Sequence, residues 1–167
     1  MYKRQAEDSE EVLVRRKEVY DGAQPSANSV ALLNLVRLSK LTADPDLDEK
    51  ASALMDRFSE QVYASPVSHT FFMAAIDFVN GPSHEVVVTG APDAEDTMAM
   101  LRALGERFLP NKVVLFVPDG EAPEVTEIAP YAEGYRSVDG KATAYVCVNF
   151  SCQLPVTSVS EMLNLLE

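Results

Sequence analysis

A short run of β-branched residues, His84–Gly90 with the sequence HEVVVTG, constrains the fold of this chain more than any other stretch. Consecutive valines that end in Thr-Gly are typical of a strand buried on both faces. Helical apolar patterns precede this run, and strands alternate with helices after it. We therefore expect it to be the central strand, placed where a helical part of the chain gives way to a sheet.

The chain before this strand has the apolar spacing of three helices joined by short links. We expect them at residues 30–41, at residues 47–63, and after Ser65-Pro66 in a third stretch that includes Phe71 and Val79 and stops at residues 80–82. The first is apolar over more than half its circumference, which predicts neighbours on two sides and self-association of the isolated chain through exposed helix faces. Residues 1–11 are charged and aperiodic and are expected to be disordered or artefactual, so the helical segment spans residues 12–82.

The chain after this strand alternates between helical and strand patterns. Asp93 is placed to cap a helix, residues 112–117 form a second apolar strand, and Thr143–Val148 form a third. Ser158 has capping-box spacing to Glu161 and predicts a last helix. Two apolar strands joined by a helix predict a right-handed βαβ unit, so we expect an α/β fold in which a small parallel three-stranded sheet unit occupies residues 83–167.

The charge of the chain excludes several classes of function. The net charge is -12, which repels phosphate backbones and anionic lipid surfaces. The sequence has neither an apolar run of about 20 residues, as a membrane span requires, nor the pattern of a secretory signal. We expect a cytoplasmic protein that binds neither nucleic acid nor membrane. With only two histidines and two cysteines, neither a metal site nor a bound cofactor is expected.

The junction after the central strand, residues 89–93, lies where a nucleotide-binding fold would place its phosphate loop. It has neither glycine-rich fingerprint, and Asp93, Glu95 and Asp96 place negative charge where an anion would bind. We therefore reject a nucleotide site.

Cys147 and Cys152 supply the only thiols, and their spacing is neither the C-x-x-C redox spacing nor half of a zinc pattern. Five steps along an extended strand span about 16 Å, whereas the Cα atoms of a disulfide lie within about 7 Å. A disulfide would need a turn at residues 149–151, which the pattern permits but does not favour. Cys147 is expected to be buried in its strand, and Cys152 to be the more reactive thiol.

A polar loop before the first helix holds Asp21, Ser26 and Asn28. A carboxylate, a hydroxyl and an amide at the mouth of a helical bundle are compatible with a ligand-binding site. Capping of the helix by Ser26 or Asn28 explains two of the three residues without a ligand. The sequence leaves both interpretations open.

Four stretches taken in order resemble the C-terminal region of the YyaL-like, spermatogenesis-associated thioredoxin-domain proteins. They are residues 19–30 (VYDGAQPSANSV), 85–90 (EVVVTG), 108–112 (FLPNK) and 144–153 (AYVCVNFSCQ). The resemblance implies a larger protein with an N-terminal thioredoxin-like domain and a central α/α toroid of the six-hairpin glycosidase type. The helices before the central strand would then be the remnant of that toroid, with residues 21–29 near its mouth.

The resemblance predicts a C-terminal fragment with a structural or regulatory function and no complete active site, in a family of redox-linked or carbohydrate-related role. Its partner would be the remainder of the full-length protein, and the C-x-x-C chemistry of the thioredoxin-like domain would not be carried by this chain. Two alternatives remain: a thiol-dependent enzyme or redox module that uses Cys152 with Cys147, and an α/β module that binds a small ligand at the strand ends near Gly90 and Pro118.

Overall fold

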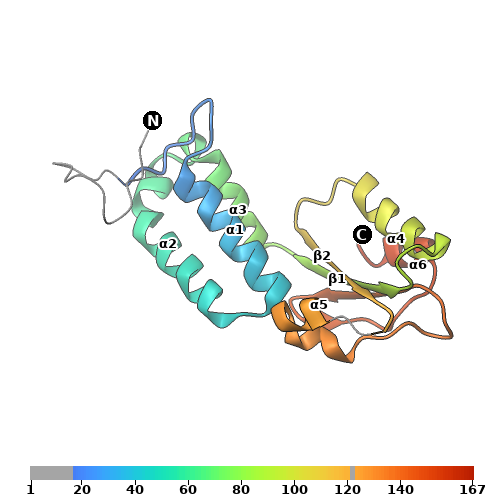
Figure 1. Cartoon of the computed structure of the whole chain (residues 1–167). Coiled ribbons are helices and arrows are strands. Elements are labelled where there is room, and N and C mark those ends of the chain that lie inside the picture. Colours follow the sequence, from blue (N-terminus) through green and yellow to red (C-terminus); the bar gives the residue numbers. More distant parts are fainter. Residues whose placement is uncertain (1–16, 121–122) are drawn as a thin grey trace.

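The computed structural model describes residues 17–120 and 123–167, so the expectation of disorder for residues 1–11 lies outside the described part of the chain. A helical unit lies beside a unit of sheet and helices (Figure 1). The helical unit holds α1 (Ala27–Thr42), α2 (Pro45–Ala64), the 3-10 helix η1 (Pro66–Ser68) and α3 (Thr70–Asn80). The second unit holds β1 (His84–Gly90), α4 (Glu95–Glu106), β2 (Lys112–Pro118), α5 (Pro123–Ile128), the 3-10 helix η2 (Pro130–Gly134), β3 (Thr143–Val148), β4 (Ser151–Cys152) and α6 (Val159–Asn164).

The three α-helices of the first unit bury one apolar core, in which Leu32 of α1, Phe58 of α2 and Phe72 of α3 are almost inaccessible to solvent. Phe58 and Phe72 pack edge to face, with ring centroids 6.2 Å apart. The side chain of Ser26 caps α1, and that of Asp44 caps α2. The three predicted helices are confirmed, each starting or ending within a few residues of the expected position.

The sheet is mixed and has four strands in the order β2-β1-β3-β4 within the described residues. β1 pairs with β2 in parallel, as the βαβ pattern predicts, but β3 runs antiparallel to β1. The prediction of a parallel three-stranded sheet is therefore wrong. The sequence of an apolar strand does not indicate its direction in the sheet. The connection through α5 and η2 leads the chain into β3 from the end of the sheet at which β1 finishes, so the two strands are antiparallel.

Alternation along the strands gives the two faces of the sheet different neighbours. Val86 and Val88 of β1 point to the face covered by α4 and α6, whereas Val87 packs against η2 on the other face. Val113 of β2 belongs to the core of the helical unit, so β2 joins the two units. Figure 1 shows the end of α1 and the short helices α5 and η2 beside the same part of the sheet.

The start of α4 differs from the prediction for Asp93. The residue before the helix is Ala94, and no side chain caps it, so the prediction that Asp93 caps this helix is wrong. Asp96 instead accepts hydrogen bonds from the amides of Thr97 and Ala142 at 2.9 and 2.8 Å. The bond from Ala142 is the main cause that lowers the pKa of the Asp96 carboxyl. The side chain of Ser158 caps α6, as its capping-box spacing predicts.

Within residues 17–120 and 123–167, no helix combines the length and the apolar character needed to cross a membrane.

Candidate functional site

A disulfide links Cys147 of β3 to Cys152 of β4, which face each other in the antiparallel ladder. Asn149 and Phe150 form the turn between these strands with φ of 50° and 62°. Positive φ at both central residues is the geometry of a tight hairpin turn. The turn that such a disulfide needs is therefore present, and the inference that the spacing does not favour the bond is wrong, because neither turn residue is a glycine that would have marked the reversal.

The two sulfurs have different surroundings, as expected from the sequence. Cys147 is 3% exposed, whereas Cys152 lies on the surface. The hydroxyl of Tyr135 lies 3.6 Å from Sγ of Cys152. Cys152 is therefore the more accessible residue of the disulfide.

A buried carboxylate lies beside this disulfide. Glu85 of β1 is the ladder partner of Cys147 and is 4% exposed. Its Oε2 accepts a hydrogen bond of 3.0 Å from the amide of Phe150. Its Oε1 lies 3.2 Å from Nζ of Lys40, an ion pair whose angles are not those of a hydrogen bond. A buried carboxylate needs such partners, because an unpaired charge is costly in an apolar interior.

Lys40 connects the end of α1 to the hairpin turn. Its Nζ donates to Oδ1 of Asn149 at 3.2 Å and lies 4.7 Å from the centre of the Phe150 ring. The cation thus contacts both turn residues and the carboxylate beneath them. The helical unit and the disulfide hairpin are therefore held together by one charged cluster, Lys40 with Glu85, Asn149 and Phe150.

Three tyrosines lie on the same face of the sheet as Glu85. The rings of Tyr135 and Tyr145 are 4.6 Å apart, and the hydroxyl of Tyr131 donates to the carbonyl of Leu41 at 3.1 Å. Burial, followed by the neighbouring Tyr135 and Glu85, raises the pKa of Tyr131 to about 12. Burial also raises the pKa of Tyr135. The raised pKa keeps the hydroxyls of Tyr131 and Tyr135 protonated at neutral pH, so both can donate a hydrogen bond.

A surface cavity of 380 Å³ lies next to the charged cluster. It is lined by Ser39, Lys40, Ala43, Asp44, Pro45, Asp48 and Phe150. The cavity opens on the turn and not on the sulfurs. The described residues contain no group of three or more His, Cys, Asp or Glu side chains that could hold a metal ion.

The polar residues of the first loop form a separate cluster. Asp21 accepts hydrogen bonds from the amides of Ser26, Phe71 and Phe72 at 2.7, 2.9 and 3.0 Å. The side chain of Ser26 accepts from the amide of Ser29, and the amide group of Asn28 donates to the carbonyl of Glu18. Each candidate thus holds the loop or a helix start, and ligand binding by these residues stays a prediction.

The two clusters lie at opposite ends of α1. Ser26 precedes the helix and Lys40 lies in its last turn, so a rise of about 1.5 Å per residue separates them by about 20 Å. Asp21, Ser26 and Cys152 therefore do not converge on one cleft.

The strand ends near Gly90 are closely packed. A methyl group added at Gly90 would overlap Oγ1 of Thr97 and would lie 3.3 Å from the Cα atom of Ala142. Ligand binding at these strand ends stays a prediction.

Sequence reasoning missed Lys40 and Glu85. A glutamate inside an otherwise apolar strand was the available signal, since Glu85 is the one acidic residue of HEVVVTG. A charge in such a position needs a buried partner. The identity of that partner depends on how α1 packs against the sheet, and the sequence pattern does not contain this.

Comparison with known proteins shows that the chain is similar to one part of several longer proteins. It is 33% identical over 162 residues to spermatogenesis-associated protein 20 of Rattus norvegicus, a match that covers 97% of this chain and 20% of the relative. The human protein of the same name is 33% identical over 153 residues. An uncharacterized protein of Caenorhabditis elegans is 29% identical over 155 residues, which is 21% of its length. No family model and no solved structure matches the chain.

The chain therefore spans about a fifth of the length of the curated relatives that it matches. The matched part is their C-terminal region, so the resemblance found in the four sequence stretches is confirmed.

Proposed function

Because this chain is a homologue of the C-terminal region of spermatogenesis-associated protein 20, we propose that it works as a regulatory C-terminal module of a larger protein. The module has no complete active site, and the Cys147–Cys152 disulfide is the element that is regulated. One observation carries this proposal: the turn closed by the disulfide binds the ion pair between Lys40 and Glu85, which joins the helical unit to the sheet.

The regulated step is a thiol–disulfide exchange with a dithiol of low reduction potential. A thiolate of the reductant attacks Sγ of Cys152, the bond between the two protein sulfurs breaks, and Cys147 leaves as a thiolate that takes up a proton. The second thiol of the reductant then displaces Cys152. The protein disulfide gains two electrons and two protons, and the reductant ends as a disulfide.

Reduction frees the short strand β4 from its covalent link to β3. Two residues of strand are marginal by themselves, so the turn loosens and Phe150 withdraws its amide from Glu85. Lys40 and Glu85 then hydrate, and the end of α1 separates more easily from the sheet. Reduction of the disulfide thus allows the helical unit and the sheet to move more freely relative to each other.

The larger protein supplies partners for the helical unit. We expect residues 12–82 to be the last helices of an α/α toroid, residues 83–167 to be a separate unit and the location to be cytoplasmic. Tyr63 and Val67, at the end of α2 and in η1, are 88% and 84% exposed. Large apolar side chains that are this exposed favour cover by another surface, either the preceding chain or, in isolation, a second copy.

Hydrogen exchange of the oxidised and reduced chain tests the proposal. We expect reduction to speed amide exchange in residues 147–152 and in the last turn of α1, residues 39–42, without changing exchange in α4. The substitution Lys40→Met should abolish the difference at α1 and keep the difference in the hairpin. Equal exchange of α1 in both redox states would refute the coupling.

A thiol-dependent enzyme is the second candidate, and the exposure of Cys152 next to the hydroxyl of Tyr135 favours it. It requires turnover: catalytic amounts of the chain would accelerate reduction of a model protein disulfide by dithiothreitol. Cys152→Ser should remove this acceleration, and Tyr135→Phe should reduce it. A stoichiometric reaction without turnover supports the regulatory element instead.

A further inference from the structure

β2 is an outermost strand of the sheet, and its second edge has no strand partner within the described residues. Two bonds show which backbone groups face that edge: the amide of His84 donates to the carbonyl of Asn111, and the amide of Asp119 donates to the carbonyl of Gly90. In a parallel ladder the bonding residues alternate. Val113, Leu115 and Val117 therefore bond to β1, so the backbone groups of Val114 and Phe116 point to the free edge.

The free edge has few of the features that protect such edges. β2 has seven residues with the sequence KVVLFVP, so it has a charge only at its first residue and a proline only at its last. Natural edges of this length are normally covered, bulged or interrupted by charges. An apolar edge with free backbone donors and acceptors is a template for a further strand.

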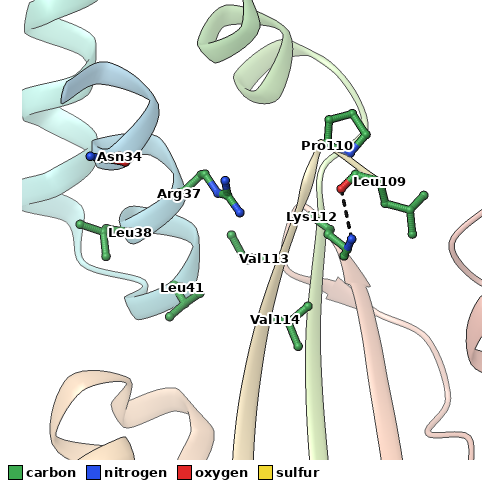
Figure 2. Close-up of a pocket in the computed structure, with 9 residues that line it drawn as sticks. All are labelled: Asn34, Arg37, Leu38, Leu41, Leu109, Pro110, Lys112, Val113 and Val114. Carbon is green, nitrogen blue, oxygen red and sulfur yellow. Dashed lines mark hydrogen bonds between the residues drawn. The ribbon is translucent and has the colours of Figure 1, made fainter. Parts of the chain in front are cut away.

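A cavity of 580 Å³ lies between this edge and α1. Figure 2 shows β2 on one side of it and α1 on the other, with the guanidinium of Arg37 pointing toward β2. The lining residues are Asn34, Arg37, Leu38, Leu41, Leu109, Pro110, Lys112, Val113 and Val114. The volume falls within the range of natural ligand-binding clefts, roughly 300–1,000 Å³.

The charges at this cavity have the opposite sign to the chain as a whole. Arg37 and Lys112 line it, although the net charge is -12. Neither cation forms an ion pair among residues 17–120 and 123–167, where the pairs are Lys40 with Glu85 and Arg107 with Glu167. Lys112 donates only to the carbonyls of Arg107 and Leu109. Desolvation, followed by repulsion from Arg37, lowers the pKa of Lys112.

We propose that the free edge of β2 binds an extended acidic segment of another polypeptide, which adds a strand to the sheet between β2 and α1. Its backbone bonds to Val114 and Phe116, and its carboxylates pair with Arg37 and Lys112. Val113 points to the face of the sheet that packs against the helical unit, which carries Arg37, whereas Lys112 points to the opposite face. Neighbouring residues of a strand also point to opposite faces, so the two carboxylates belong to neighbouring residues of the segment. A second copy of this chain fits poorly, because it would bring the same two cations against each other.

A synthetic peptide tests this on the full chain: the sequence Glu-Glu-Val-Thr-Val-Thr-Glu-Glu, blocked at both ends, presents an acidic pair in either strand direction. We expect it to slow hydrogen exchange at the amides of Val114 and Phe116. The amides of Val113 and Leu115, already bonded to β1, are slow in both states and serve as internal controls. A peptide with N-methyl groups on alternate residues should not bind, because it cannot form the ladder.

The charges are tested by substitution. Arg37→Gln should weaken peptide binding by about threefold to fivefold, as for a partly exposed ion pair, whereas Arg102→Gln on the exposed surface of α4 should leave it unchanged. Exchanging the glutamates for lysines should abolish binding to the native chain and restore it to the double variant Arg37→Glu, Lys112→Glu. Equal binding of the N-methylated peptide would overturn the proposal. So would a dimer in light scattering that already protects Val114 and Phe116 without peptide.

Discussion

Asp21 should be the polar residue whose removal destabilises the helical unit most. It is 9% exposed, and its carboxylate accepts from three backbone amides that belong to two different helix starts. α3 has no side-chain cap of its own, because the side chain of His69, which precedes the helix, forms no hydrogen bond with the first amides of α3. Asp21 therefore takes the place of a cap from about fifty residues away in sequence.

The magnitude follows from the three bonds. Replacement with Ala leaves the buried amide of Phe72 without a partner, which costs about 1–3 kcal/mol. The part-buried amides of Ser26 and Phe71 can partly regain water, and loss of the negative charge at the start of α3 costs a further 0.3–1 kcal/mol or so. We expect Asp21→Ala to lower the free energy of unfolding by about 2–4 kcal/mol. Asp21→Asn, which keeps one acceptor oxygen, should cost about half of that.

Urea unfolding followed by circular dichroism measures both variants, with Asp44→Ala as the matched control. Asp44 caps α2 through one exposed bond to the amide of Asp46, so its loss should cost only about 0.5–2 kcal/mol. If Asp21→Ala costs no more than Asp44→Ala, the carboxylate does not join the two helix starts. Its use as a ligand-binding residue would then become the better explanation.

Three further predictions concern the sheet unit. Gly90→Ala should destabilise the protein by about 1–3 kcal/mol, because the added methyl would meet Thr97. Gly105→Ala in α4, where an added methyl has no neighbour within 4 Å, should instead stabilise the protein by about 0.4–1 kcal/mol. Equal shifts of the thermal midpoint in the two variants would contradict the close contact between Gly90 and Thr97. Tyr131 has its folded pKa raised to about 12, above an unfolded value of about 10, so the free energy of unfolding is unaffected below pH 10 and falls as the pH rises toward 12. Alkaline unfolding curves should show this slope, and Tyr131→Phe should make it shallower. Ser158→Ala should cost about 0.5–2 kcal/mol through loss of the α6 cap, and an unchanged thermal midpoint would show that α6 is held by packing alone.

The candidate site shows which features sequence patterns could predict. Burial of Cys147 and exposure of Cys152 follow from one residue lying in an apolar strand and the other after a polar link. The disulfide between them could not be predicted with the same security, because it depends on positive φ at Asn149 and Phe150. Neither residue is glycine, so the local sequence does not indicate a turn with positive φ at both positions.

For the fold as a whole, apolar periodicity was sufficient to predict the longer helices and the strands β1, β2 and β3, but not the short elements η1, η2 and β4. The three helices, the central strand His84–Gly90 and the last helix all depend on local spacing and capping, which act within a few residues. Strand direction and the partners of charged residues depend on contacts between distant segments. β3 is antiparallel because of the path taken by the connection before it, and Glu85 is paired because α1 ends beside the hairpin. Such contacts are decided by how the buried faces of the whole chain fit together, so only the tertiary structure contains them.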